Sequence, residues 1–184
     1  MSKHFSNEDF EKQVLTHLDL LYFTALKVTG HPHDAEDLIQ ETYYKAFNQS
    51  DQLKDLQKCK PWLYRIMINT WKNLRAKRSR EILTGDQEYL EYSMHEHTDG
   101  NLQTHQISPE KGLMIKELWK NVDIALTRLP PNYRMVIILS DIEGFSYKEI
   151  SKIMEWPMGT VMSSLSRARR QLGSLLAKHH SKGA

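Results

Sequence analysis

The sequence predicts an all-α protein made of two small helical domains joined by a flexible linker. Apolar residues recur at helical spacing along most of the 184 residues, and no segment alternates convincingly with the period of two of a half-buried strand. Residues 81–107 interrupt this pattern, because they are acidic, rich in His and Gln and only weakly periodic. Such a composition is typical of an interdomain linker. We therefore expect domains at residues 5–82 and 110–178, with the linker at 83–109.

The first two helices of the N-terminal domain are indicated by residues that begin and end helices. The first is expected over residues 6–29, with Ser6 as its cap and Gly30 at its end. The second is expected from about Asp34, as its cap, to Gln49. Each helix carries an apolar stripe that can face a core.

The third helix is expected from Pro61, which suits a first helical turn, to about Arg80. Its apolar stripe is expected to contain Leu63, Met67, Thr70 and Leu74. Trp62, Tyr64 and Trp71 are interleaved with basic residues on the same segment. Core packing is the favoured role of Trp62, whereas the role of Trp71 stays open between packing and stacking on a base.

The C-terminal domain is expected to begin with two helices. The residues Ser-Pro-Glu at 108–110 supply a cap, a first-turn proline and a first-turn acid, and they open a helix that runs to about Leu129. The two prolines at 130–131 end this helix. A second helix is expected over residues 132–143.

The end of the chain has the plan of a helix-turn-helix. Ser146 and Glu149 have the spacing of a capping box and start a short helix that runs to Met154. A turn at 155–158 follows, and a longer helix is expected over 159–177. A short capped helix, a turn of about four residues and a longer helix match the arrangement that places a recognition helix in the major groove.

The last helix has two contrasting faces. Its core face is expected to carry Val161, Leu165, Ala168 and Leu172. The opposite face carries Ser163, Ser166, Arg167 and Arg170, with Thr160 at its edge. Short hydroxyl side chains allow close approach to DNA, and arginine can bind a guanine edge or a phosphate. The alternative is an ordinary amphipathic C-terminal helix.

Charge is segregated along the chain although the formal net charge is only +2. Residues 58–80 contain bases and no acid, whereas residues 81–110 contain acids and neither Lys nor Arg. Blocks of alternating sign suggest separate surfaces for separate partners. Solvated helix faces without a partner are the alternative.

The third helix also has a polar face that suits single-stranded DNA. Asn69, Asn73 and Arg80 share this face, with Arg65 and Lys77 at its margins. Basic side chains can follow a phosphate backbone, and an asparagine can hydrogen-bond the edge of an unpaired base. The face lies beside the apolar stripe, so it can remain accessible when the stripe is buried.

Three segments together resemble a known family. They are DAEDLIQETYYKAF at 34–47, KPWLYRIMINTWKN at 60–73 and LPPNYRMVIILSDIEGFSYKEISKIMEWPMGTVMSSLSRARRQL at 129–172. They resemble regions 2.1–2.2, 2.3–2.4 and 4 of extracytoplasmic-function (ECF) sigma factors, which belong to the sigma-70 family. The resemblance is greatest to the subgroup that is controlled by zinc-binding, redox-sensing anti-sigma factors. It rests on GTVMS at 159–163 and on ETY at 41–43, WLYRI at 62–66 and NT at 69–70.

The resemblance implies a transcription initiation factor with three kinds of partner. It implies binding to the clamp helices and flap of core RNA polymerase, to promoter DNA, and to an anti-sigma factor. The implied polymerase-binding residues are Asp37, Gln40 and Glu41. Asn69 and Asn73 would capture a flipped base of the −10 element, and the nearby DNA backbone would be held by Arg75, Lys77, Arg78 and Arg80.

The resemblance also places the −35 element on the last helix, at Thr160, Ser163 and Arg167, and the exposed face adds Arg170. Three positions depart from what many family members carry: Met162, Ser164 and Ser166. Ser164 replaces an arginine and so removes one phosphate anchor. Weaker or altered −35 binding is expected.

Enzyme chemistry is not expected, and neither is a cofactor, because the sequence contains no phosphate-cradling glycine loop and no nucleophile motif. His31, His33 and Asp34 lie close together, but the two histidines flank a proline, and no clear distant cluster completes a metal site. Cys59 lies between Lys58 and Lys60, which could lower the pKa of its thiol and favour a redox role. An unreactive thiol is the favoured interpretation.

The sequence also bears on location and on the main rival function. No apolar run approaches the roughly 20 residues that cross a bilayer, and the polar N-terminus argues against a signal peptide, so we expect a cytoplasmic protein without membrane insertion. The rival is a helix-turn-helix transcriptional regulator with an N-terminal helical interaction domain. A regulator of that kind has no need for the asparagine-bearing basic helix at 62–80.

Overall fold

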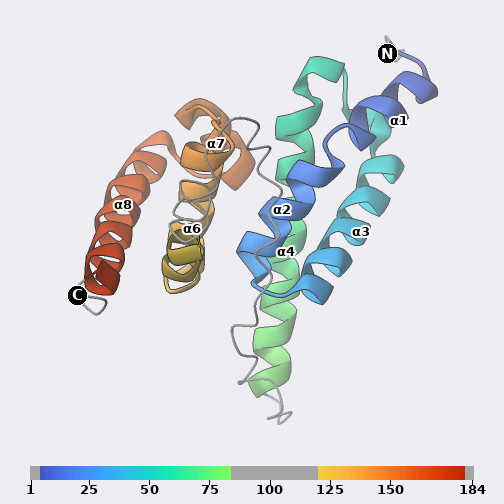
Figure 1. Cartoon of the computed structure of the whole chain (residues 1–184). Helices are drawn as coiled ribbons and strands as arrows, with labels where there is room; N and C mark the ends of the chain where they lie inside the picture. Colours follow the sequence, from blue (N-terminus) through green and yellow to red (C-terminus); the bar gives the residue numbers. More distant parts are fainter. Residues whose placement is uncertain (1–4, 84–119, 181–184) are drawn as a thin grey trace, which may run out of the picture.

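The computed structural model describes the backbone of residues 5–83 and 120–180, and the side chains of 5–79 and 120–177. Helices and turns account for these residues, and no strand occurs in the described ranges. Helices α1 to α4 form one group and the C-terminal helices α6 to α8 form another (Figure 1). The expected all-α fold class, with two helical groups, is confirmed.

The chain begins with two helices where one was expected. Helix α1 spans Asn7–Leu15 and α2 spans Leu18–Thr29. The Thr16 hydroxyl donates to the carbonyl of Lys12 at 2.8 Å, and the amide of His17 donates to the carbonyl of Val14. These bonds close the last turn of α1. The expectation of a single helix over 6–29 was wrong, because the apolar spacing continues across the break and no Gly or Pro marks it.

Helix α3 spans Pro32–Asn48 and begins earlier than expected. Its N-cap is His31, whose side chain makes no capping hydrogen bond, and Pro32 occupies the first turn. Asp34 is therefore inside the helix and is not its cap. Its carboxylate instead forms a two-pronged ion pair with the guanidinium of Arg78. Two short 3-10 turns, Ser50–Gln52 and Leu56–Lys58, lead to the next helix.

Helix α4 spans Cys59–Leu83 and is buried on two adjoining faces. The first face contains Leu63, Met67 and Thr70, as expected. The second contains Tyr64, Ile68 and Trp71. Leu74 was expected in the core stripe but is 36% exposed. Two buried faces need two neighbours, and α4 packs against α3 on one side and α7 on the other.

The C-terminal domain begins, within the described residues, with helical residues 120–127. The start expected for that helix, at 108–110, lies outside the described residues. Helix α6 spans Pro131–Ile137 and continues as a π-helix at Ile138–Ile142. The sequence predicted an uninterrupted helix over 132–143 and did not indicate this change of winding. Helix α7 spans Tyr147–Met154 and α8 spans Met158–His180.

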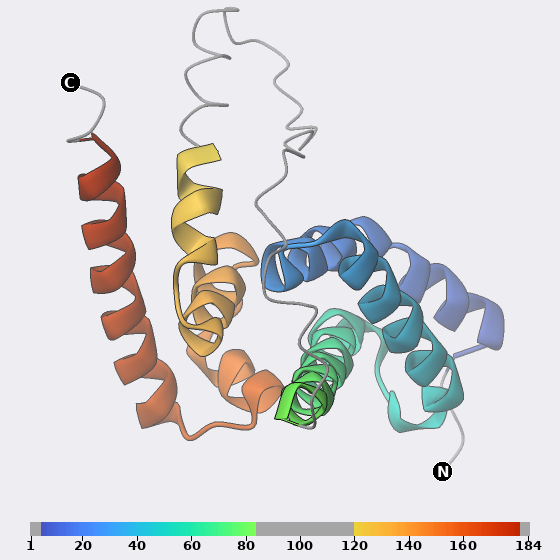
Figure 2. The ribbon, with the colours of Figure 1, turned by 90° about the horizontal axis from the view of Figure 1, so that it is seen from below.

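The two helical groups pack directly against each other. Figures 1 and 2 both show α2 and α4 between α1 and α3 on one side and the C-terminal helices on the other. The buried apolar side chains of both groups form one continuous core. At its centre the ring of Tyr64 meets the ring of Phe145 edge-on, with centroids 4.9 Å apart. No helix among residues 5–83 and 120–180 is long and apolar enough to span a membrane.

Candidate functional site

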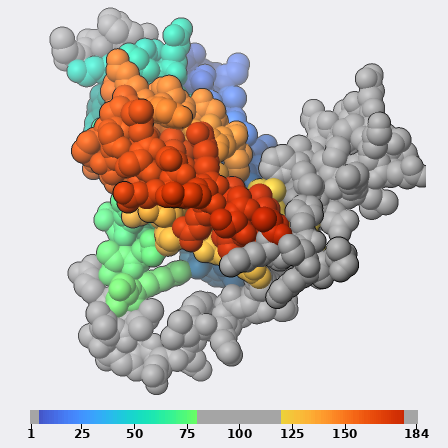
Figure 3. Space-filling model, turned by 90° about the vertical axis from the view of Figure 1, so that its left-hand side faces the viewer, coloured from blue at the N-terminus to red at the C-terminus, as the bar shows by residue number. Residues whose placement is uncertain are grey.

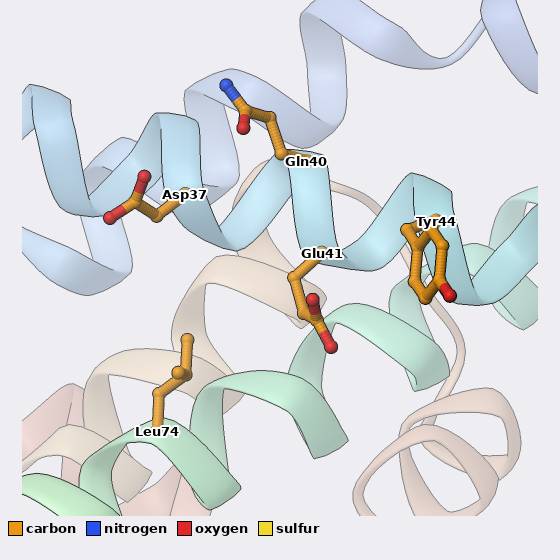
Figure 4. A pocket seen from close by; sticks show the side chains of 5 residues that line it. All are labelled: Asp37, Gln40, Glu41, Tyr44 and Leu74. Atoms are coloured by element: carbon orange, nitrogen blue, oxygen red, sulfur yellow. The ribbon is translucent and has the colours of Figure 1, made fainter.

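A shallow groove lies between α3 and α4, at the residues expected to bind polymerase (Figure 4). It is lined by Asp37, Gln40, Glu41, Tyr44 and Leu74. Glu41 points toward α4 and Leu74 points from α4 toward α3, whereas Gln40 points away from α4. Tyr44 is 67% exposed. A groove with acidic, aromatic and apolar side chains suits an amphipathic partner helix that carries basic residues.

Within the described residues, the acids of this groove pair with side chains of their own helix. Asp37 lies 3.3 Å from the ring of His33, and Glu41 lies 3.0 Å from the ammonium of Lys45, each one turn away along α3. Lys45 also donates to the hydroxyl of Thr70 on α4 at 3.2 Å. Ion pairs between exposed side chains contribute about 0–1 kcal/mol. These acids can therefore exchange their partners for basic residues of another protein at little cost.

The polar face of α4 carries the residues expected to read a single strand. Asn73 is exposed and Asn69 is half-buried. Trp71 is only 5% exposed, and the guanidinium of Arg75 lies over its ring at 4.9 Å. The sequence left the role of Trp71 open between packing and stacking on a base, and in this structure Trp71 packs. Trp62 packs against the core, with its ring edge-on to Phe10 at 6.1 Å, which confirms the favoured role.

The basic residues at the end of α4 differ in their surroundings. Arg78 is engaged with Asp34, and this hydrogen-bonded guanidinium holds the pKa of the Asp34 carboxyl below its usual range. Lys77 is exposed. The side chain of Arg80 lies outside the described residues. Arg78 therefore ties α4 to α3, a role that the sequence did not indicate.

The helix-turn-helix is formed as expected. The Ser146 hydroxyl accepts from the amide of Glu149 at 3.3 Å, and the Glu149 carboxylate accepts from the amide of Ser146 at 2.9 Å. These bonds cap α7 and lower the pKa of Glu149. The turn after α7 is fixed by Ser151, whose hydroxyl donates to the carbonyl of Trp156 at 2.6 Å.

Helix α8 presents its predicted polar face to the solvent. Val161, Leu165 and Ala168 are buried as expected. The exposed side chains include all four residues expected to contact the −35 element: Thr160, Ser163, Arg167 and Arg170. Figure 3 looks onto α8, which lies across the surface of the described helices. The neighbouring Arg169 is held by Asp141, so it is not equivalent to Arg167 and Arg170.

Comparison with known proteins decides the family. Residues 14–81 match the family model for Sigma-70 region 2, and residues 120–172 match the model for Sigma-70 region 4. The ECF RNA polymerase sigma-E factor of Escherichia coli K12 is 34% identical over 139 residues, which cover 76% of this chain and 72% of that protein. The chain belongs to the family of ECF RNA polymerase sigma factors.

Other sigma factors support this assignment. The ECF RNA polymerase sigma factor SigE of Mycolicibacterium smegmatis is 34% identical over 183 residues. That alignment covers 95% of this chain but only 64% of the relative, so this sigma factor spans just under two thirds of that protein's length.

Two solved structures have the same fold. The sigma factor RpoE of Bartonella quintana, in complex with the anti-sigma factor NepR, has a TM-score of 0.74 and is 30% identical. That alignment covers 92% of this sigma factor and 98% of RpoE. CnrH in complex with the cytosolic domain of CnrY has a TM-score of 0.60 at 21% identity and covers 94% and 90% of the two chains, which is likeness of fold alone.

One feature of this sigma factor was missed by sequence reasoning: the helix-turn-helix domain touches the base-reading helix. The guanidinium of Arg65 donates to the Glu155 carboxylate at 2.8 Å and 3.2 Å. Arg65 and then the Asn69 amide hold the pKa of Glu155 below its usual range. Lys72 donates to the carbonyl of Met154, at the end of α7, at 2.9 Å. No sequence signal could pair residues that are 90 and 82 positions apart.

Two features of the sequence raised the question of metal or redox chemistry: a group of His and Asp residues, and Cys59. No group of His, Cys, Asp and Glu among the described residues could hold a metal ion. Cys59 is fully buried, and burial raises the pKa of its thiol to about 11. Burial therefore favours the neutral thiol, which is the interpretation preferred from the sequence, over a thiolate stabilised by Lys58 and Lys60. Cys59 is therefore a packing residue.

Proposed function

We propose that this protein recruits core RNA polymerase to specific promoters and captures the melted −10 strand. It catalyses no reaction itself, because nucleotide addition belongs to the polymerase. The proposal rests on one observation: a single chain contains both domains. The region 2 domain has an exposed groove, and the region 4 domain has an exposed recognition helix. A protein of this kind works where transcription occurs, so we propose a cytoplasmic location.

Polymerase binding is assigned to the groove between α3 and α4. Asp37, Gln40 and Glu41 would contact the clamp helices of the largest subunit, and region 4 would contact the flap. The exposed aromatic ring of Tyr44 and the side chain of Leu74 add apolar area to this surface. Both kinds of contact are typical of a helix that docks in a groove.

Capture of the −10 strand is assigned to the polar face of α4. Asn69 and Asn73 would hydrogen-bond a base that has left its stack, and Arg75, Lys77, Arg78 and Arg80 would hold the nearby backbone. Because the Arg78 guanidinium donates to Asp34, this role requires one of two things. Arg78 must release Asp34, or it must bind phosphate through N–H groups that do not bond to the Asp34 carboxylate. Extruding a base costs a few kcal/mol, which a small number of such contacts can offset.

Recognition of the −35 element is assigned to α8, through Thr160, Ser163, Arg167 and Arg170. Met162 is 53% exposed on the same helix, at a position where many relatives carry a basic residue. Ser164 and Ser166 replace larger side chains. Because each lost phosphate contact lowers the salt-dependence slope by about 0.9, we propose that −35 binding here is weaker and less dependent on salt.

Control by an anti-sigma factor is part of the proposal. RpoE of B. quintana, whose fold this chain shares over both domains, was solved with an anti-sigma factor. The motifs GTVMS and ETY, WLYRI and NT favour the subgroup with zinc-binding, redox-sensing anti-sigma factors. Co-purification from the native host would test both ideas: recovery of polymerase subunits alone would argue against an anti-sigma factor, and a partner without zinc would argue against the subgroup.

The domain limits remain those proposed from the sequence, 5–82 and 110–178 with a linker at 83–109. Both matched family models lie within these limits. The linker itself falls largely outside the described residues. Its acidic composition favours a connection that stays away from DNA.

A binding assay with and without core polymerase separates this function from the rival regulator. We expect the free protein to bind duplex promoter DNA weakly and the complex with core polymerase to bind it tightly and specifically. Tight, specific duplex binding by the free protein as a dimer would instead support a helix-turn-helix regulator.

A further inference from the structure

Helix α8 carries an exposed methionine at the edge of the face that is proposed to meet DNA. Met162 lies in the second turn of α8 and is 53% exposed. A single exposed apolar side chain needs no explanation by itself, because folded proteins carry many of them. Its position on the helix and the charges around it decide what it can contact.

The position of Met162 places it within reach of base edges. The N-terminal residues of a recognition helix are the ones that contact bases in the major groove. At 100° per residue, Met162 lies about 40° around the helix axis from Ser166, and both are exposed. Thr160 and Arg167 lie on the other flank of the same polar face. Met162 is therefore one wall of the surface that would enter the groove.

The charge of α8 favours nucleic acid as the partner of this surface. Residues 158–180 contain three arginines and one lysine, and they contain neither Asp nor Glu. A helix with this charge attracts a polyanion such as the DNA backbone. The apolar group that the major groove offers to a protein is the C5-methyl of thymine. An exposed methionine on such a helix matches that group.

The arginine nearest to Met162 around the helix is held by another element. Arg169 lies about 20° from Met162 and two turns further along α8. Its guanidinium donates to the Asp141 carboxylate at 2.6 Å and 3.0 Å, and to the hydroxyl of Ser140 at 3.2 Å. Both partners belong to the π-helix Ile138–Ile142. The flank at Met162 therefore presents a thioether to the groove, and the guanidinium beside it is turned to the protein.

The hydroxyl next to Met162 does not bind thymine in this conformation. Ser163 donates its hydroxyl hydrogen to the carbonyl of Thr160 at 3.2 Å. Its oxygen can then only accept hydrogen bonds. Thymine presents an acceptor, O4, in the major groove and no donor. The methyl group is therefore the feature of thymine that this part of α8 can recognise.

We propose that Met162 is a specificity-determining residue of the −35 interaction and that it contacts the C5-methyl group of a thymine in the major groove. This rests on the proposed function, which places α8 on the −35 element. The methionine side chain is flexible and polarisable, so it can close around a methyl group without a fixed hydrogen-bond geometry. The contact distinguishes thymine from cytosine, which has no C5-methyl group.

The first test removes the methyl group and changes nothing else in the DNA. A promoter is selected from a library by run-off transcription with core polymerase. Each thymine of its −35 element, on either strand, is then replaced in turn by deoxyuridine, and holoenzyme affinity is measured by competition gel shift. We expect one replacement to weaken binding about fourfold, which corresponds to burial of one methyl group. At that position, 5-methylcytosine paired with guanine should bind more tightly than cytosine paired with guanine.

The second test changes the side chain. Met162→Ala should bind the thymine promoter about fourfold more weakly than the native protein and should not respond to deoxyuridine. Met162→Leu keeps an apolar side chain of similar volume and should keep most of the response. Ile142→Ala is the matched control, because Ile142 is an apolar residue of the same domain that is 38% exposed and lies outside α8. It should respond to deoxyuridine as the native protein does.

Three results would overturn the inference. The first is equal affinity of the native protein for thymine and deoxyuridine at every −35 position, or selected promoters whose −35 elements contain no thymine on either strand. The second is a full response to deoxyuridine in Met162→Ala. The third is an equal loss of affinity in Met162→Ala with and without the methyl group, which would assign Met162 to a contact with the polymerase flap.

These results are separate from failure of the proposed function. The function fails if the native protein supports no initiation with core polymerase, whereas the inference is tested on promoters from which initiation occurs. Thermal unfolding of each variant shows that it is folded. The deoxyuridine series with the native protein does not depend on any variant.

Discussion

At the scale of single residues, Asn69 is the most exacting test of the proposed −10 reader. Asn69→Ala removes a side-chain amide from a half-buried position without opening the apolar core. We expect core polymerase binding to be unchanged and promoter opening to fall about tenfold or more, since one specific base contact contributes about 1–3 kcal/mol. Fluorescence of 2-aminopurine placed in the −10 element reports opening. Opening at the native rate would remove Asn69 from the proposal.

Arg167 tests the −35 surface in the same way. Arg167→Ala should weaken recruitment to promoters that carry a −35 element by about tenfold, and it should reduce discrimination against mutated −35 sequences. Arg167→Lys is the matched variant, because it keeps the charge but loses the two-pronged donor geometry. Gel-shift titrations with polymerase holoenzyme provide the affinities. If the response to −35 mutations is the same in all three proteins, Arg167 does not read bases.

Some roles of individual residues could be predicted and others could not. The exposure of Arg167 follows from its position opposite Leu165 and Ala168 on one helix, which is a local property. The engagement of Arg78 with Asp34 is not local, because the two residues lie on different helices. Cys59 shows the limit most clearly: the lysines beside it in the sequence left open a lowered pKa, whereas burial in three dimensions raises it.

At the scale of helices, the capping box of α7 makes a direct contribution to stability. Ser146→Ala removes one acceptor and leaves the amide of Glu149 without its side-chain partner. We expect the free energy of unfolding to fall by about 1 kcal/mol, measured by urea denaturation. Ser174→Ala on exposed α8 is the control and should change stability little. An equal loss of unfolding free energy in both variants would mean that the capping hydrogen bonds of α7 make no specific contribution to stability.

The acids that hold the helices in place also set the acid stability of the protein. The pKa is lowered in the folded state for Asp9 and Glu149 by their caps, for Asp34 by Arg78, and for Asp141 by Arg169. A lowered folded pKa stabilises the protein above the unfolded value of about 4, and this contribution is lost as the pH falls through the folded value. Burial also lowers the pKa of His17, so stability declines slightly as the pH falls through about 6.5, and we expect the steeper fall in melting temperature below about pH 4. A melting temperature that rises on acidification would contradict this assignment.

Helix boundaries were predictable where a side chain or a glycine marks them. Ser6, Ser146 and Gly30 act as expected, with Gly30 at φ 78. The break after Thr16 was missed because the bonds that make it are ones that threonine can form in any helix. The π-helix at Ile138–Ile142 was missed because it keeps the same apolar residues and changes only the winding.

At the scale of the whole molecule, the family and the fold class could be predicted, but the contact between the domains could not. Apolar periodicity shows which face of a helix is buried and not what covers it. Helix α4 illustrates this, since the sequence predicted one apolar stripe on it, interpreted Tyr64 as one of the aromatic residues interleaved with the bases, and left the role of Trp71 open. The structure shows that α7 of the other domain packs against α4 and that the ring of Phe145 contacts Tyr64.

Run-off transcription with purified core polymerase and a promoter library tests the central claim most directly. The claim is that one helical module reads duplex DNA while the other holds a base that has left its stack. We predict that core polymerase alone starts at no defined site, and that adding this protein yields transcripts from a discrete set of promoters that share −35 and −10 sequences. If no promoter in the library supports initiation when the protein is added, the account is contradicted.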